Sequence, residues 1–284
     1  AGRMVFASAP GLHSVSNYFD GDGRLVRTVQ GEGDDRRETS FQYAPDGTLR
    51  SVSNALGETL VTFSDEIGRV VDQILPDSSM VSFKYDRSSS PVKVTLPHGQ
   101  EHGFSYGPLD LVLGYTAPAA DAPSNTTWTY NSARQPVSLT KPDGTVISNS
   151  YDSAGRLSAV TASRGGETEN IAYTYNGPWL ETVSRAGSDV QYGYNCFLKL
   201  SESAAGHQVG WMYDNSFRVA AVELDSTNSA AYAYDADGAV VSAGALSLEY
   251  GASTGLLEGT SLGQVSDSRS FNGFGEIILR LIAF

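Results

Sequence analysis

The sequence predicts an all-β fold built from tandem antiparallel β-hairpins. Three observations lead to this prediction: an aromatic residue recurs at a near-constant interval, apolar and polar residues alternate before it, and a turn sequence ending in glycine follows it. Gly (30 residues) and Tyr (15 residues) are spread along all 284 residues. Such a composition favours strands and turns over helices.

The aromatic repeat covers almost the whole chain. The first and last aromatic positions, which we call anchors, lie 252 residues apart over twelve intervals, so the mean period is 21 residues. Self-similarity at a short fixed period is typical of repeat architectures. The anchors are Phe19, Tyr43, Phe63, Tyr85, Tyr106, Tyr130, Tyr151, Tyr175, Tyr194, Tyr213, Tyr234, Tyr250 and Phe271.

The residues before each anchor predict a half-buried strand. A second bulky residue often stands two positions earlier, and the residue between, such as Gln42 or Lys84, is mostly polar. Since side chains alternate between the two faces of a strand, both bulky residues share one face. The pairs are Phe41 and Tyr43, Phe83 and Tyr85, Trp128 and Tyr130, Trp211 and Tyr213, and Tyr232 and Tyr234.

A tight turn follows the anchor. In Asp152-Ser153-Ala154-Gly155 an Asp opens the turn and a Gly closes it, which favours a type I turn followed by a residue of positive φ. Asp235-Ala236-Asp237-Gly238 and Ala44-Pro45-Asp46-Gly47 repeat the pattern. Leu or Val then begins a return strand, and a second turn such as Pro142-Asp143-Gly144 leads to the next aromatic strand. Each unit is therefore strand, turn, strand, turn.

The return strand is less regular than the aromatic strand. Leu157 and Val160 are three residues apart, which in a flat strand places them on opposite faces. Either a β-bulge or a strand buried on both faces would explain this spacing. A helix is disfavoured, because glycines interrupt every unit and no apolar stripe of period 3.6 extends beyond a few residues.

Single hairpins are marginal in water, so the units must join edge to edge into one twisting sheet. We expect a single array over residues 1–284 with about thirteen hairpins, of which the clear repeats span about residues 15–276. Both ends look truncated from a larger protein.

Charge and composition exclude several functions. The net charge of −13 and the pI near 4.6 oppose binding to a nucleic-acid backbone. No apolar run reaches 18 residues, and the apolar stretch 277–284 is too short to span a membrane. The one cysteine, Cys196, cannot form an intrachain disulfide, and we expect a buried thiol within a strand.

No candidate set of catalytic, cofactor-binding or metal-binding residues emerges. His98 and His102 are four residues apart, but they flank a predicted turn at Gly99, where helical ligand geometry is lost. Asp20 and Asp22 lack the spacing of a calcium loop and fit the turn repeat instead. No Gly-x-Ser-x-Gly motif is present. The sequon beginning at Asn125 matters only in a eukaryotic source.

The unit Tyr151-Asp152-Ser153-Ala154-Gly155-Arg156-Leu157 resembles the tyrosine-aspartate (YD) repeat of RHS (rearrangement hot-spot) proteins, toxin-complex C components and teneurins. Phe19–Leu25 and Tyr234–Gly238 are similar, and Thr140–Thr145 resembles the turn between repeats of bacterial RHS proteins. The segments starting at Tyr106 and Tyr194 lack both the Asp and the turn glycine. The bacterial branch fits best, given the single cysteine and the regular turns.

The resemblance implies a spiralling sheet that forms part of a hollow β-shell. It predicts a structural, non-enzymatic wall segment of a secreted or injected protein, enclosing a C-terminal toxin or other cargo. The expected partners are the rest of the polypeptide shell, the cargo, and a secretion or injection apparatus, at a secreted or cell-surface location. The alternative is a cell-surface adhesin or carbohydrate-binding module that contacts glycans. The self-cleavage motif that ends RHS cores does not follow Gly275.

Overall fold

The computed structural model describes residues 3–118 and 124–284. The chain divides into two units, Ala1–Asp143 and Gly144–Phe284, and each is described by itself. Within the described residues the only helical segments are two short 3-10 turns, η1 (Gly33–Asp35) and η2 (Pro108–Asp110). Neither segment is long and apolar enough to cross a bilayer.

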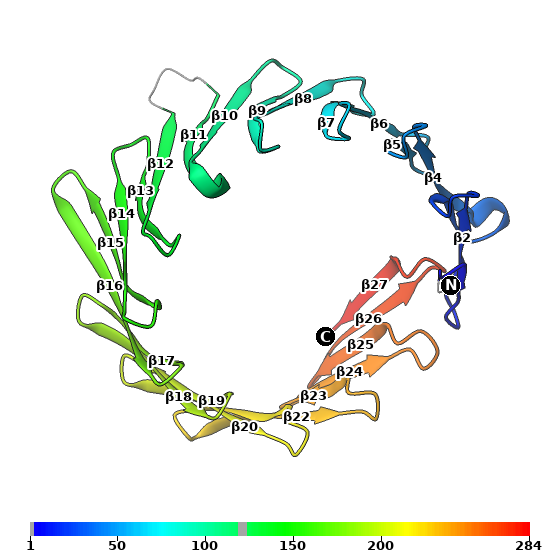
Figure 1. Ribbon diagram of the computed structural model, residues 1–284. Coiled ribbons are helices and arrows are strands. Elements are labelled where there is room, and N and C mark those ends of the chain that lie inside the picture. Colours follow the sequence, from blue (N-terminus) through cyan, green and yellow to red (C-terminus); the bar gives the residue numbers. More distant parts are fainter. Residues whose placement is uncertain (1–2, 119–123) are drawn as a thin grey trace. The chain divides into compact units, whose positions relative to one another are not determined.

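The first unit is a single antiparallel sheet in which each strand pairs with the next one along the chain (Figure 1). Its strands are β1 (Phe6–Ala7), β2 (Val15–Phe19), β3 (Leu25–Gln30), β4 (Arg37–Tyr43), β5 (Leu49–Ser53), β6 (Thr59–Ser64), β7 (Val70–Ile74), β8 (Met80–Tyr85), β9 (Pro91–Thr95), β10 (Glu101–Tyr106), β11 (Val112–Thr116), β12 (Asn125–Tyr130) and β13 (Pro136–Thr140).

The second unit repeats this order, again with each strand from β15 onward antiparallel to its predecessor. The prediction of an all-β array of hairpins is therefore confirmed. Its strands are β14 (Val146–Tyr151), β15 (Leu157–Arg164), β16 (Glu167–Asn176), β17 (Trp179–Arg185), β18 (Ser188–Asn195), β19 (Leu198–Ala204), β20 (His207–Tyr213), β21 (Val219–Leu224), β22 (Asn228–Tyr234), β23 (Val240–Ala243), β24 (Leu246–Tyr250), β25 (Leu257–Leu262), β26 (Val265–Phe271) and β27 (Ile277–Ala283).

A β-bulge explains the irregular return strand. Tyr151 pairs with Leu157, whereas Ser150 pairs with Ala159, so Ser158 is an extra residue. The bulge brings Leu157 and Val160 onto the face that carries Tyr151. The same one-residue shift follows the anchor position in all thirteen hairpins of the described chain.

One predicted anchor, Phe63, is wrong. The bulge of the third hairpin pairs Ser64 with Val70, so Ser64 occupies the anchor position and Phe63 points to the opposite face. With Ser64 in place, the intervals from Tyr43 and to Tyr85 both become 21 residues. The aromatic signal failed because this repeat has a serine where the others have a ring.

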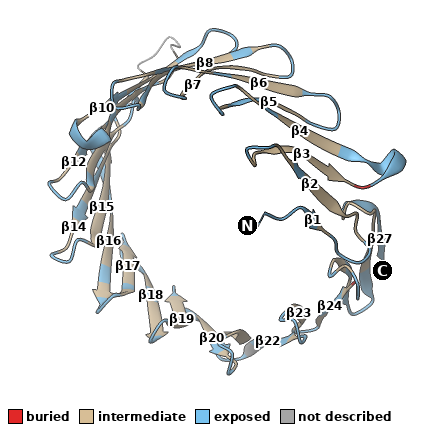
Figure 2. Ribbon diagram, turned by 45° about the vertical axis from the view of Figure 1, so that its right-hand side comes forward, coloured by how far each residue is buried: buried red, intermediate tan, exposed pale blue. Residues whose placement is uncertain are grey.

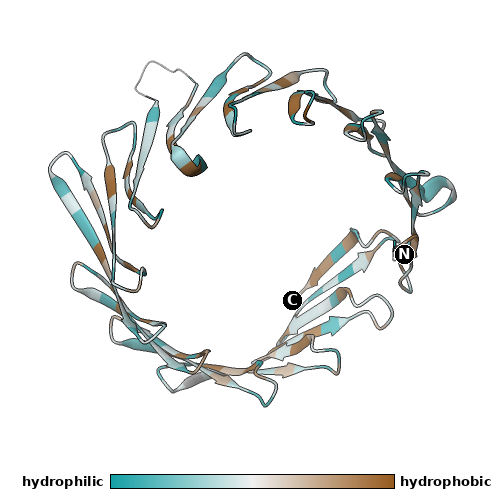
Figure 3. Cartoon of the chain, viewed as in Figure 1, coloured by the Kyte–Doolittle hydropathy of each residue, from teal (hydrophilic) through white to brown (hydrophobic). Residues whose placement is uncertain are grey.

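Each unit has two chemically different faces. The ring face carries the anchors and the aliphatic residues opposite them, whereas the other face, which we call the hydroxyl face, is rich in Ser and Thr. In the second unit four serines lie directly opposite one another across β23–β26: Ser242, Ser247, Ser261 and Ser266. Hydrophobic and hydrophilic residues accordingly alternate along the strands (Figure 3).

The sheet has almost no core. Only Ala221 (6% exposed) and Ser51 (8%) stand out as buried side chains, and no side chain among the described residues is fully buried. Most strand residues are only partly covered (Figure 2). The chain exposes 18430 Å², whereas two separate compact units of half its mass would together expose about 14,000 Å². Cohesion must therefore come from contacts between neighbouring hairpins.

Deleting Ser158 tests the role of the bulge. Without the extra residue, Val160 and Ala162 would turn to the hydroxyl face and Thr161 to the ring face, since a one-residue slip reverses every side chain. We expect the deletion to lower the urea midpoint strongly, with about 1 kcal/mol lost per half-buried aliphatic side chain. The substitution Ser158→Ala should change the midpoint little. Equal midpoints for the deletion and the substitution would contradict this role.

Candidate functional site: a clasp between hairpins

In six of the thirteen hairpins the turn after the anchor position begins with an aspartate, as at Asp152. Asp152 Oδ1 accepts hydrogen bonds from the backbone N–H groups of Ala154 (2.9 Å) and Arg156 (2.9 Å), and Oδ2 accepts one from Arg156 Nε (2.8 Å). The Arg156 N–H, followed by the guanidinium, lowers the pKa of Asp152 below its ordinary value of 3.8. The carboxylate therefore fixes both the turn and the position of the arginine.

The arginine reaches the next hairpin. Its guanidinium carbon lies 4.2 Å from the ring centroid of Tyr175, the following anchor, in a cation–π contact. The Tyr175 hydroxyl in turn donates a hydrogen bond to the backbone oxygen of Leu157, the residue directly after Arg156 (2.8 Å). We call this set of Asp, Arg, following Tyr and accepting carbonyl the clasp, because it joins one hairpin to the next.

The complete clasp occurs four times in the described chain. The distances from guanidinium to ring are 5.0, 4.8 and 4.3 Å in the other three, and the hydroxyl bonds are 2.9, 2.7 and 2.8 Å. Each aspartate binds its arginine through Oδ2 at 2.7–2.8 Å. These clasps are Asp20–Arg24–Tyr43, Asp65–Arg69–Tyr85 and Asp214–Arg218–Tyr234.

Several hairpins keep only part of the clasp. Tyr106, Tyr130 and Tyr213 donate their hydroxyls to the backbone oxygens of Pro91, Val112 and Lys199 at 2.8–2.9 Å. A hydrogen bond of this kind contributes about 1 kcal/mol. The hydroxyl bond is therefore more widely retained than the arginine contact.

At the turn between β16 and β17, a tryptophan replaces the arginine. Trp179 stands directly before the return residue Leu180, the place that Arg156 has in its own hairpin. Its ring stacks on Tyr194, the next anchor, with centroids 5.6 Å apart and an interplanar angle of 25°. An aromatic stack thus takes over the contact between hairpins.

A second version of the turn inverts the hydrogen-bond direction. In three five-residue turns, two after an anchor and one between β5 and β6, an Asn stands at the place of the Asp and a Glu or Gln follows four positions later, so the amide donates and the partner accepts. Asn Oδ1 still accepts the same two backbone N–H groups. The three pairs are Asn54–Glu58 (2.6 Å), Asn131–Gln135 (3.0 Å) and Asn272–Glu276 (2.9 Å).

The residues considered for metal binding do not come together. His98 lies in the turn between β9 and β10, whereas His102 lies within β10 and shares a 2.7 Å hydrogen bond with the Tyr115 hydroxyl. Asp20 and Asp22 both contact Arg24, at 2.7 and 3.0 Å. No cluster of metal-ligating side chains occurs in residues 3–118 and 124–284.

The expectation of a buried thiol at Cys196 is wrong. Cys196 is exposed and has a φ of 52°. Asn195 pairs with Leu198, so Cys196 and Phe197 form a two-residue turn between β18 and β19. The turn was missed because neither Gly nor Asp marks it. Asn125, by contrast, begins β12 and is exposed.

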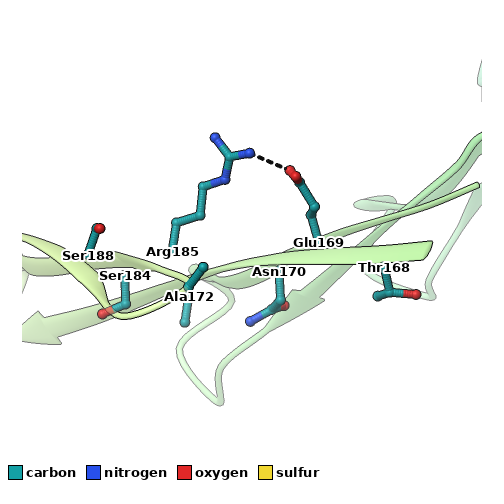
Figure 4. A pocket seen from close by; sticks show the side chains of 8 residues that line it. Thr168, Glu169, Asn170, Ala172, Ser184, Arg185 and Ser188 are labelled. Carbon is teal, nitrogen blue, oxygen red and sulfur yellow. Dashed lines mark hydrogen bonds and ion pairs between the residues drawn. The ribbon is translucent and has the colours of Figure 1, made fainter.

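The hollows found over the described residues are open to solvent, and the side chains that line them form no catalytic set. One, of about 670 Å³, lies over β16–β18 (Figure 4). Glu169 and Arg185 project from one side of the strands and form a 2.6 Å ion pair, while Asn170, Ala172 and Ser184 project from the other side. Both charged groups are more than half exposed, so their pairing contributes little.

A single layer of hairpins joined by Asp–Arg–Tyr clasps defines a YD-repeat wall. The chain belongs to the Teneurin YD-shell family, whose model matches residues 1–284. A search of curated proteins found no match.

Solved structures share the fold. Two are similar over 95% of this chain with a TM-score of 0.50: the TcdB2-TccC3-Cdc42 complex (13% identity, 19% of that chain) and TcdB2-TccC3 without its hypervariable C-terminal region (12% identity, 21% of that chain). The present chain thus spans about a fifth of the length of these toxin-complex chains.

Replacing an Asp–Arg pair by an Asn–Glu pair tests whether the first and fifth residues of a turn stabilise it by pairing with each other. Arg69→Glu alone places a second carboxylate beside Asp65, whereas Asp65→Asn with Arg69→Glu recreates the Asn54–Glu58 pair. We expect the melting temperature of the double variant to lie above that of Arg69→Glu but below that of the wild type, because Tyr85 still loses its guanidinium. Asp65→Asn combined with Arg218→Glu should show no rescue, since these residues belong to different turns. Equal effects in both double variants would refute the pairing.

The clasps also predict how stability depends on pH. A carboxylate whose pKa is lower in the folded than in the unfolded chain stabilises the fold above its unfolded pKa, and this stabilisation is lost as the pH falls through its folded pKa. Asp20, Asp65, Asp152 and Asp214 all have pKa values below 3.8. We expect a constant melting temperature above about pH 5 and a decline below about pH 4. Replacing all four by Asn should make this decline shallower, with the remainder due to other carboxyl groups of lowered pKa such as Asp225 and Asp267, and Asp237→Asn should leave it unchanged.

Proposed function

We propose that this chain is a wall segment of a hollow shell, which encloses a C-terminal toxin or other cargo polypeptide and has no catalytic activity of its own. The observation that carries the proposal is the almost coreless single layer, in which no described side chain is fully buried. A sheet that covers nothing with its own chain is suited to enclosing something else.

The contacts within the sheet support a wall rather than a globular domain. Each clasp joins a hairpin only to its neighbour, as in other repeat proteins, so the layer can be extended without a new core. The last strand, β27, exposes apolar residues on both faces, with Ile277 55% and Leu281 57% exposed. Such a strand is expected to be covered by further parts of the same polypeptide shell, since exposed apolar edges promote aggregation.

The chemistry of the described residues supports a non-enzymatic role. The aspartates of the four clasps are each hydrogen-bonded to backbone N–H groups and an arginine. These carboxylates therefore hold the turns in place. The family assignment points in the same direction. The net charge of −13 disfavours a nucleic-acid partner.

The extent of the array, the location of the protein and its route of delivery are proposed from the family and from the repeat. We propose a single array over residues 1–284, a secreted or cell-surface location, and delivery by a secretion or injection apparatus. The alternative of a glycan-binding adhesin has one supporting observation, the exposed ring of Phe197 (80%), because aromatic rings stack on sugars.

Protease protection in the full-length protein tests the proposal. A C-terminal cargo segment should resist digestion until the shell is denatured. Arg69→Ala with Arg156→Ala, which breaks two clasps, should increase its cleavage rate, whereas Arg134→Ala, an exposed turn arginine outside the clasps, should not. Rapid digestion of the cargo segment in the wild type would overturn the proposal. Micromolar glycan binding without a protected segment would favour the adhesin.

A further inference from the structure

Three neighbouring hairpin turns of the second unit carry aromatic rings. Trp179 lies at the turn between β16 and β17, Phe197 between β18 and β19, and Phe217 between β20 and β21. Because alternate turns of an antiparallel sheet lie on the same edge, the three residues share one edge and stand one hairpin apart. We call these three residues the aromatic rim.

Two rings of the rim, those of Phe197 and Phe217, are exposed, and Phe217 stands at a position where a ring is unfavourable. Phe217 is 72% exposed and has a φ of 62°, a left-handed conformation that bulky residues rarely adopt. The corresponding turn position is glycine in other hairpins, as at Gly155 and Gly238. The backbone at Phe217 is therefore strained, and its ring is not covered by the described chain.

The other two rings of the rim contact each other. Phe197 is 80% exposed, and its ring packs edge-on against Trp179 with centroids 6.4 Å apart. Isolated exposed apolar residues are ordinary, but rings gathered on consecutive turns indicate a contact surface.

The rim is electrically neutral in an acidic protein. Residues 176–179 and 195–198 contain no charged side chain, although the chain has a net charge of −13. At the third turn, Asp214 and Arg218 neutralise each other at 2.8 Å. The Arg156 guanidinium, which donates to the backbone oxygen of Gly177, is likewise paired with Asp152 at 2.7 Å, so the rim offers a charged partner no unpaired group.

We propose that the aromatic rim anchors the protein to the interface of a zwitterionic lipid bilayer. The two exposed phenylalanines offer about 300 Å², far below the roughly 800 Å² that each partner of a stable protein complex buries. Insertion into a bilayer interface requires no such area or shape complementarity, and aromatic rings favour that depth. The charge of −13 excludes anionic headgroups as the preferred surface. This role is separate from enclosing cargo.

Co-sedimentation with phosphatidylcholine vesicles tests the proposal on the 284-residue chain. We expect the wild type to bind, and the binding to weaken when phosphatidylserine is added. Phe197→Ser and Phe217→Gly should each lower the partition coefficient at least fivefold. Phe217→Gly should at the same time raise the melting temperature, because glycine relieves the left-handed strain. Loss of binding in that variant then cannot be attributed to unfolding.

Phe284→Ser provides the matched control, since Phe284 is 93% exposed but lies outside the rim. Its partition coefficient should equal that of the wild type. Absence of binding by the wild type, or an equal loss in Phe284→Ser, would overturn the proposal. Self-association that Phe197→Ser abolishes, without vesicle binding, would also overturn it and would identify the rim as a contact between copies. Protection of cargo is measured independently and does not depend on either outcome.

Discussion

The contact between one hairpin and the next is the interaction on which the structure depends. A globular domain of this length would bury a shared core, but here the described residues form a single layer with only two well-buried side chains, Ala221 and Ser51. The fold must therefore be stabilised by contacts between neighbouring hairpins. The clasp supplies such a contact, because one aspartate orders its turn, positions an arginine and so holds the ring of the following tyrosine.

The β-bulge makes the clasp possible. By inserting one residue after the anchor pair, it keeps the aliphatic residues of the return strand on the ring face, where the next tyrosine packs. It recurs in every hairpin of the described chain, including those that have lost the arginine or the aromatic anchor. The backbone geometry of the repeat is thus more uniform than its side chains.

The chemical roles within the turn are also preserved where the residues change. Asp with Arg and Asn with Glu or Gln are two solutions to one requirement, a hydrogen bond between the first and fifth residues of the turn. Trp179 likewise replaces a cation with an aromatic stack. These substitutions let the sequence diverge while the strand order within each unit is kept, which agrees with the low identity to structures of the same fold.

The sequence by itself determined the repeat, the strand–turn–strand order and the turn chemistry, because these follow from local spacing and from the conformations that Asp and Gly favour. Only the tertiary structure decided that Ser64 is an anchor, that Ser158 forms a bulge and that Cys196 lies in an exposed turn. Register depends on which residues face each other across strands. Ser64 lacks the ring that marks the other anchors, although Asp65 and Gly68 mark its turn, and the turn at Cys196 has neither Asp nor Gly. The clasp joins residues about 20 positions apart, so it became visible only when neighbouring hairpins were placed side by side.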